Sequence, residues 1–169
     1  RRIDTRFTSL LLSLWFSRMT LRKSNHPPIP ARILLVDDNR SGLAARKAIL
    51  AELGYTVDCA EDGASGLKLF EKHNHDLVVT DFRMPDMDGS RLIHELRRRK
   101  PDALIVLLSG FVEALGLNEH NTGADTVIMK NSREVQHLTS AVDRLLRNAR
   151  KPPVKETAPA RKSLKAKKA

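Results

Sequence analysis

The segment DLVVTDFRMPDMDG, residues 76–89, joins a short apolar run to a carboxylate and then to a turn. Residues 77–80 are apolar or β-branched without polar alternation, as in a strand that is buried on both faces of a parallel sheet. Asp81 follows directly, so it stands at the carboxyl end of that strand. Ligands of open α/β sheets bind outside the carboxyl ends of the strands. The segment therefore predicts a buried strand with a functional site at Asp81.

Similar apolar runs occur before and after this segment, and stretches with helical periodicity separate them. The other expected strands are residues 32–36, 56–60, 104–108 and 126–129. The expected helices are residues 39–53, 64–72, 90–100 and 132–150. Strands that alternate with helices predict an α/β fold. We expect a doubly wound, five-stranded parallel sheet of the flavodoxin-like (βα)5 type across residues 31–150.

Two parts of this pattern are weaker than the rest. The second strand, residues 56–60, is short, and its pattern is weaker because Asp58 interrupts it. Gly116 and Asn118 interrupt the periodicity of residues 111–122, which predicts only a weak or short helix there.

The formal charge of +10 belongs to the ends of the chain. Residues 1–30 carry six basic side chains against one acidic, and residues 151–169 carry seven against one, whereas residues 31–150 are one charge negative. A length of 169 residues fits one domain with two tails. We expect a flexible basic extension over residues 1–30 and a disordered basic tail over residues 151–169. Weak binding of nucleic acid through the tail is one function that its charge allows.

The first residues resemble a targeting signal only superficially. The apolar run of residues 10–16 is far shorter than the roughly 20 residues that a membrane span needs, and no small-residue cleavage site follows it. Because the chain begins with Arg1 and Met19 stands just before the domain, we expect residues 1–18 to be a non-native extension. The short apolar run predicts no transmembrane segment. Cys59 is the only cysteine, which favours a reducing, cytoplasmic location.

Polar side chains follow the expected strands on what should be one edge of the sheet. They are Asp37, Asp38, Asp81, Ser109 and Lys130. Two carboxylates 4 Å apart repel by about 4 kcal/mol at an effective dielectric of 20, so this acidic group needs a cation. Oxygen ligands suit Mg²⁺, with Mn²⁺ as an alternative. A carboxylate nucleophile, a metal and two groups that bind phosphoryl oxygens predict phosphoryl transfer to Asp81.

These residues resemble the signature of response-regulator receiver domains. The resemblance rests on LLVDDN at residues 34–39, DFRMPDMDG at residues 81–89, Ser109 and Lys130, and it covers residues 31–150. It implies that Asp81 is the phosphoacceptor, and that Asp38, Asp81 and the backbone carbonyl of Arg83 bind Mg²⁺ directly while Asp37 acts mainly through water.

The resemblance also implies a signalling partner and a response. A histidine kinase or a histidine phosphotransfer protein would supply the phosphoryl group. Ser109 would move toward that group and Lys130 would pair with it, which shifts the population between two states of a protein-binding surface that recognises a downstream target. The protein would catalyse its own phosphorylation and dephosphorylation without being a conventional enzyme.

Two positions depart from the family pattern, and two others belong to its variable positions. Val127 stands where a Tyr or Phe switch residue is usual, and Asn131 replaces a proline that would have fixed the backbone after Lys130. Arg83 and Phe111 occupy positions that tune the lifetime of the acyl phosphate in this family. The transfer chemistry is unaffected by these departures, but the route from phosphorylation to the surface is left open.

Other interpretations remain open from sequence alone. The fold could be a non-switching scaffold whose basic tails bind nucleic acid or an acidic partner. A metal-dependent phosphatase is disfavoured, because Arg83 stands where a D-x-D motif would have its second acid. Residues 73–75, His-Asn-His, predict an exposed loop without a role, and the basic run of residues 97–100 predicts a solvated helix end.

Overall fold

The computed structural model describes residues 29–150 of the chain. The extension expected over residues 1–18, the rest of the N-terminal segment to residue 28, and the basic tail of residues 151–169 lie outside the described residues. The disorder and nucleic-acid contact that we expect of these ends therefore stay predictions.

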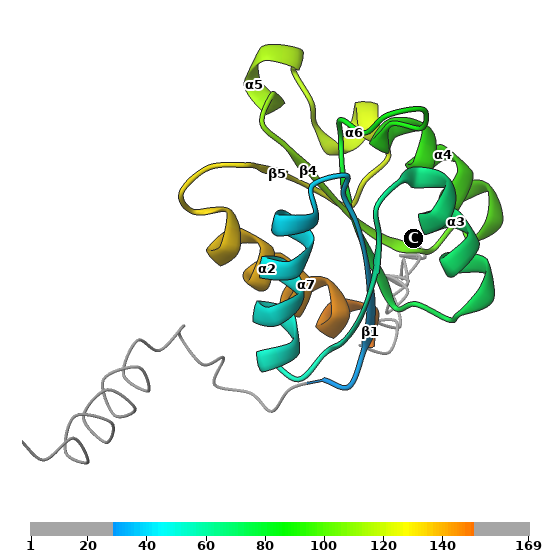
Figure 1. The fold of residues 1–169 in the computed structure, drawn as a ribbon, viewed down its shortest axis with the longest axis vertical. Coiled ribbons are helices and arrows are strands. Elements are labelled where there is room, and N and C mark those ends of the chain that lie inside the picture. The colour runs from blue at the N-terminus through cyan, green and yellow to red at the C-terminus, as the bar shows by residue number, and fades with distance from the viewer. Residues whose placement is uncertain (1–28, 151–169) are drawn as a thin grey trace, which may run out of the picture.

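A single parallel sheet forms the centre of the domain (Figure 1). Its strands are β1 (Arg32–Val36), β2 (Thr56–Ala60), β3 (Leu77–Asp81), β4 (Leu104–Ser109) and β5 (Thr126–Met129). Their order across the sheet is β2-β1-β3-β4-β5, and every neighbouring pair is parallel. The chain therefore moves to one side of β1 and then to the other, which confirms the doubly wound α/β fold. The reversal of strand order between β1 and β3 is the place where such sheets bind ligands.

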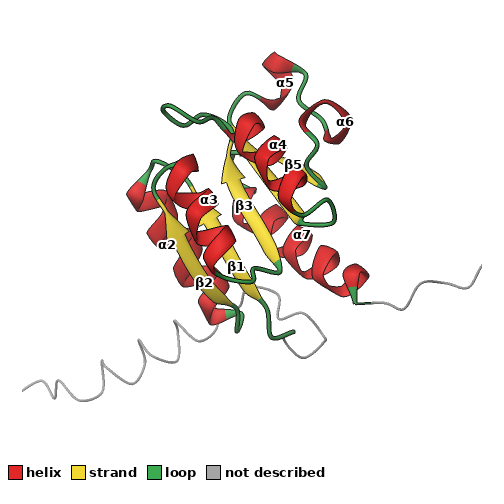
Figure 2. Ribbon diagram, turned by 90° about the vertical axis from the view of Figure 1, so that its right-hand side faces the viewer, coloured by secondary structure: helices red, strands yellow, loops and turns green. Residues whose placement is uncertain are grey.

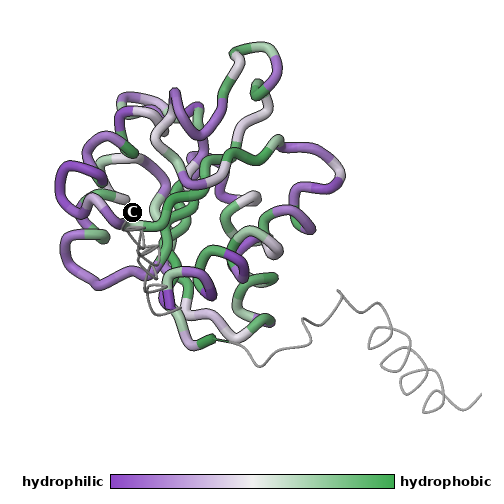
Figure 3. The backbone as a smooth tube through the Cα atoms, turned by 180° about the vertical axis from the view of Figure 1, so that it is seen from behind, coloured by the Kyte–Doolittle hydropathy of each residue, from purple (hydrophilic) through white to green (hydrophobic). Residues whose placement is uncertain are grey.

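Helices cover both faces of the sheet (Figure 2). They are α2 (Arg40–Glu52), α3 (Gly63–Lys72), α4 (Gly89–Arg99), α5 (Val112–Leu115), α6 (Glu119–Thr122) and α7 (Glu134–Ala149). One apolar cluster joins α2 and α7 to one face through residues such as Leu50 and Val142, and a second joins α4 and α3 to the other through residues such as Leu96. The strands form an apolar centre between them (Figure 3). Burial on both faces explains why the strands lack polar alternation.

The two weak parts of the sequence pattern behave differently. Residues 111–122 form two four-residue helices, as expected of an interrupted pattern, because Gly116 ends α5 in the left-handed conformation and Asn118 caps α6. β2 is a regular five-residue strand, because Asp58 is half-buried and is held by Arg32 and His75 at 2.7 Å and 2.9 Å. The strand expected at residues 56–60 is therefore confirmed with the same bounds, and Asp58 does not break it.

Two expectations need correction. His75 does not lie in an exposed loop, because it is only 2% exposed and stacks on Phe70. The basic run of residues 97–100 is not uniformly solvated either. Arg97 donates to the carbonyls of Gly123 and Ala103 and pairs with Asp125 at 2.8 Å, so it fastens the end of α4 to the segment before β5. Within residues 29–150, no helix is long and apolar enough to cross a membrane.

Candidate functional site

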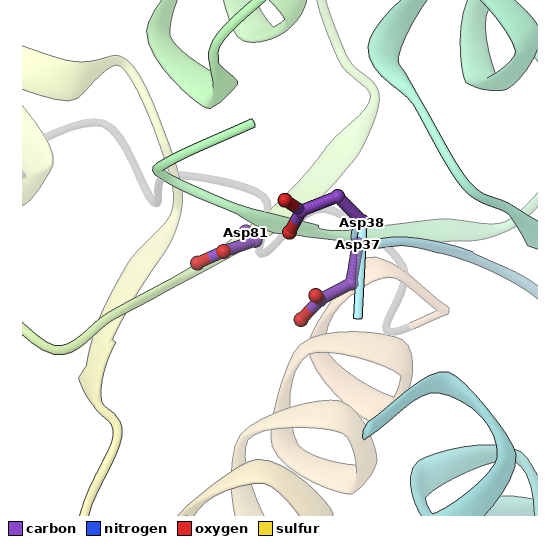
Figure 4. A group of neighbouring side chains, drawn as sticks. All are labelled: Asp37, Asp38 and Asp81. Atoms are coloured by element: carbon purple, nitrogen blue, oxygen red, sulfur yellow. The ribbon is translucent and has the colours of Figure 1, made fainter. Parts of the chain in front are cut away.

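Asp37, Asp38 and Asp81 meet at the carboxyl edge of the sheet. β1 and β3 are neighbours, and their register pairs Val36 with Thr80, so Asp37 directly after β1 lies beside Asp81 at the end of β3. One carboxylate oxygen from each aspartate lies within 4.8 Å of one from each of the others (Figure 4). The strand-end argument from sequence therefore placed these side chains together correctly.

Asp37 is 2% exposed, and both of its carboxylate oxygens have partners. Oδ1 accepts from the backbone N–H of Asn39 at 2.8 Å. Oδ2 accepts from Arg46 Nη1 at 2.9 Å and from Lys130 Nζ at 3.0 Å. A buried carboxylate with this many partners is held in a fixed orientation, and its charge is compensated by two cations.

Asp81 is 7% exposed and has one oxygen engaged. Oδ1 accepts from the backbone N–H of Phe82 at 2.8 Å and lies 2.9 Å from Lys130 Nζ. Burial raises the pKa of Asp81 above its ordinary value, and the neighbouring charge of Asp37 adds to this, while Lys130 opposes it. Within residues 29–150 no side chain or backbone group bonds Oδ2, so that oxygen is the one available to an electrophile.

Lys130 and Ser109 reach the site from the two strands beyond β3. Lys130 directly follows β5, and its backbone N–H donates to the carbonyl of Ser109 at 2.8 Å, which ties the two strand ends together. Ser109 is buried, and its hydroxyl oxygen accepts from the N–H of Phe111 at 3.1 Å. The Ser109 hydroxyl hydrogen has no acceptor among the described residues, so the group can still donate to a ligand.

The loop from Phe82 to Asp88 is held close to Asp81 by Gly89. The Gly89 N–H donates to the Phe82 carbonyl at 2.9 Å, and a Cβ on Gly89 would overlap the carbonyl oxygen of Asp81. Glycine is therefore required here by the close approach of two backbone segments. The same loop contains Asp86 at φ 62°, a left-handed conformation that Asp tolerates better than most residues.

Arg83 is exposed, and its guanidinium lies over the ring of Phe111 at 4.1 Å from the centroid. The two positions assigned to tuning the phosphoryl lifetime are therefore in direct contact as a cation–π pair at the edge of the site. That the Arg83 carbonyl binds a metal stays a prediction.

The donor set fits a hard divalent cation. Asp38 is exposed, and neither its carboxylate nor Asp81 Oδ2 has a partner within residues 29–150. The free oxygens therefore belong to the two aspartates expected to bind metal directly, while the fully engaged oxygens belong to Asp37, which is expected to act through water. Carboxylate oxygens on an open edge suit Mg²⁺, which keeps several water ligands.

Sequence reasoning missed Arg46 and Glu134. Arg46 lies in α2 between Leu43 and Leu50, on the helix face that packs against the sheet, and it pairs with Glu134 at 2.7 Å as well as with Asp37. The signal was present in the sequence, since an arginine three residues after one core leucine and four before another occupies a position where an apolar residue is expected.

The two departures from the family pattern are accommodated locally. Val127 pairs in register with Leu107 and packs on the cluster under α4. Asn131 accepts from the Arg133 N–H at 2.8 Å through its side chain and from the Glu134 N–H at 3.0 Å through its carbonyl, so the turn after Lys130 is closed without proline.

Known proteins resemble this chain in sequence. The family model described as "Response regulator receiver domain" matches residues 33–143. The transcriptional regulatory protein GlrR of Escherichia coli is 33% identical over 115 residues, which are 68% of this chain and 24% of that protein. A response regulator receiver protein of Anaeromyxobacter is 42% identical over 81 residues, 48% of this chain and 34% of that protein. The chain thus spans about a quarter to a third of these relatives.

Solved structures resemble it in fold. The response regulator protein TrrA of Thermotoga maritima, in complex with Mg²⁺-BeF, matches with a TM-score of 0.62 and 35% identity, over 68% of this chain and 98% of that one. The same protein in complex with the histidine kinase ThkA matches with a TM-score of 0.62 and 35% identity, over 69% and 98% of the two chains.

Proposed function

The chain belongs to the response regulator receiver domain family, and on this premise we propose that it is a phosphoacceptor. In this proposal Asp81 takes a phosphoryl group from the phosphohistidine of a histidine kinase or of a phosphotransfer protein. The complex of TrrA with a histidine kinase supports a kinase as the donor. The modified domain then presents a changed surface to a downstream protein.

The observation that carries the proposal is the arrangement around Asp81. One carboxylate oxygen is fixed by the Phe82 N–H and Lys130, and the other is free beside Asp38. Asp81 Oδ2 forms a bond to phosphorus while the P–N bond of phosphohistidine breaks. The electron pair returns to the imidazole, which takes up a proton from solvent. No general base is needed as long as Asp81 is ionised.

The residues of this chain position the transferred group and neutralise it. A bound Mg²⁺, held by Asp38, Asp81 and the Arg83 carbonyl with Asp37 acting through water, would supply charge neutralisation. Lys130 turns from the carboxylates to the phosphoryl oxygens, which carry more negative charge after transfer than Asp81 alone did. The Ser109 hydroxyl donates to the same oxygens, because its hydrogen is not otherwise engaged.

We expect the response to leave the site through the segment after Ser109. The Ser109 hydroxyl oxygen accepts a hydrogen bond from the Phe111 N–H, and a rotation of Ser109 toward the phosphoryl group breaks that bond. Phe111 is 42% exposed and Leu115 of α5 is 47% exposed, so a movement of this segment changes the apolar surface. Val127 has no ring to rotate, and we therefore assign the readout to the Ser109–Phe111 contact.

Incubation with acetyl phosphate or phosphoramidate and Mg²⁺ tests the function. The wild-type protein should gain the mass of one phosphoryl group, and the adduct should be lost on treatment with hydroxylamine, as acyl phosphates are. Asp81→Asn should gain nothing. Failure of the wild-type protein to form an adduct with either donor and with a purified histidine kinase would reject the proposal.

A further inference from the structure

Arg46 is a buried cation that belongs to neither the sequence motif nor the metal ligands. It is 9% exposed, its Nη1 donates to Asp37 Oδ2 at 2.9 Å, and its Nε donates to Glu134 Oε1 at 2.7 Å. Gly42, one turn earlier in α2, leaves room for it, since a Cβ there would lie 2.8 Å from Nη1. The guanidinium is therefore closely fitted between α2, α7 and the acidic site.

Asp37 Oδ2 is shared by two cations that have different tasks. Lys130 bonds Asp37 at 3.0 Å and Asp81 at 2.9 Å. When Lys130 pairs with a phosphoryl group on Asp81, its bond to Asp37 is lost or weakened. Asp37 is almost fully buried, and a buried carboxylate that loses its partner is strongly destabilised.

We propose that Arg46 is a positioning residue that keeps Asp37 paired while Lys130 turns to the phosphoryl group. The role rests on the proposed function, because it requires phosphorylation of Asp81. Arg46 lowers the free energy of the state in which Lys130 has left Asp37, and it contacts neither the phosphoryl group nor Asp81.

Glu134 holds Arg46 in place for this role. It begins α7, on the chain segment that follows Lys130, and its own N–H closes the turn at Asn131. The Nε bond to Glu134 fixes the guanidinium fork, so that Nη1 stays on Asp37 without help from Lys130. The pair also links the Lys130 turn to α2 in a chain that lacks the usual proline after the lysine.

The test separates metal binding from binding of a phosphoryl mimic. Arg46→Met with Glu134→Met replaces the ion pair by an apolar pair of similar size and leaves the net charge unchanged. Mg²⁺ affinity is measured by NMR titration, and beryllofluoride affinity is measured at saturating Mg²⁺. Arg32→Met serves as a control for the loss of an Arg–Asp pair, because its pair with Asp58 lies at the far end of β1 from the site.

We expect the double variant to bind Mg²⁺ at least as well as the wild type and beryllofluoride about tenfold more weakly, since a buried acceptor that loses its partner costs about 1–3 kcal/mol. Arg32→Met should leave both affinities unchanged. A beryllofluoride affinity within about threefold of wild type, or a parallel fall in Mg²⁺ affinity, would overturn the role of Arg46. Absence of beryllofluoride binding by the wild type would reject the proposed function and this role with it.

If the double variant does not fold, the wild-type protein carries the test. The Arg46 Nη1–H, which donates to Asp37, should exchange slowly with solvent when Mg²⁺ and beryllofluoride are added, while the Lys130 ammonium resonance shifts. Accelerated exchange of the Arg46 Nη1–H in that complex would show that Arg46 leaves Asp37 together with Lys130, and would overturn the proposal.

Discussion

Replacing Gly89 by alanine should damage both the stability and the chemistry of the domain. Gly89 is the first residue of α4 and lies in space against the backbone of Asp81. A Cβ at this position would overlap the Asp81 carbonyl oxygen and lie 2.9 Å from the Phe82 Cα. These contacts are with backbone atoms, which cannot rotate away as a side chain can. The alanine methyl group therefore has to displace the main chain of the phosphoacceptor itself.

The size of the effect follows from the overlap. Ordinary contact with a Cβ begins near 3.4 Å, so the backbone must retreat by about 1 Å, and overpacking of this kind costs about 1–3 kcal/mol. The higher helix propensity of alanine relative to glycine offsets at most about 1 kcal/mol of this loss of stability. We expect a net loss of about 2 kcal/mol. A displacement of about 1 Å at the reacting group should also slow phosphorylation by on the order of 100-fold.

Urea unfolding followed by circular dichroism measures the first effect, and the initial rate of adduct formation with phosphoramidate measures the second. Gly110→Ala is the control for stability, because a Cβ there meets no atom within 4 Å. That control should be neutral or stabilising by about 0.4–1 kcal/mol. Equal stability of the two variants, together with a phosphorylation rate of Gly89→Ala close to wild type, would refute the reasoning.

Three other substitutions test the buried polar groups. Burial holds the pKa of His75 below its ordinary value, so the unfolded state takes up the proton first as the pH falls. The stability of the wild-type protein should therefore decrease as the pH drops through about 6.5. His75→Phe should lose less stability than the wild type between about pH 7.5 and about pH 5.5, measured by urea unfolding. Burial raises the pKa of Asp81, so its charged form opposes folding above that pKa. Asp81→Asn should therefore raise the free energy of unfolding at neutral pH by about 1 kcal/mol, and a lower free energy of unfolding than that of the wild type would contradict this. Arg97→Met leaves the Ala103 carbonyl and Asp125 without the guanidinium donor, and it should lower the free energy of unfolding by about 2 kcal/mol in the same assay. A change within about 0.5 kcal/mol would show that residues 97–100 are a solvated helix end.

The sequence predicted the sheet well because the three central strands, β1, β3 and β4, are buried on both faces and a polar residue stands at the carboxyl end of each. The meeting of Asp37, Asp38 and Asp81 followed from strand order alone, since parallel strands end on one edge. No pattern of spacing could show that both cations bond the same oxygen of Asp37, because those bonds depend on the side chains of Arg46 in α2 and of Lys130 after β5.

The failures have a common physical cause. Sequence reasoning assigned His75 to an exposed loop and Arg97 to solvent, and it treated Asp58 as a weak point of its strand. Each of the three is bonded by a residue far away in sequence, although His75 Nδ1 has no partner within residues 29–150. Polarity excludes burial only when no partner is available, and a partner such as Arg32 or Asp125 is visible only after the chain has folded. Arg46 was also missed, but in its case the sequence held a signal, because the residue lies on an otherwise apolar helix face.

Mapping the modified residue tests the central claim most directly. After reaction with phosphoramidate and Mg²⁺, reduction with borohydride converts an aspartyl phosphate to homoserine, which peptide mass spectrometry locates. We predict the conversion at Asp81, with Asp37 and Asp38 unmodified and no conversion in Asp81→Asn. Conversion at Asp37 or Asp38 in the wild-type protein, or an adduct that persists in Asp81→Asn, would contradict the assignment of Asp81 as the phosphoacceptor.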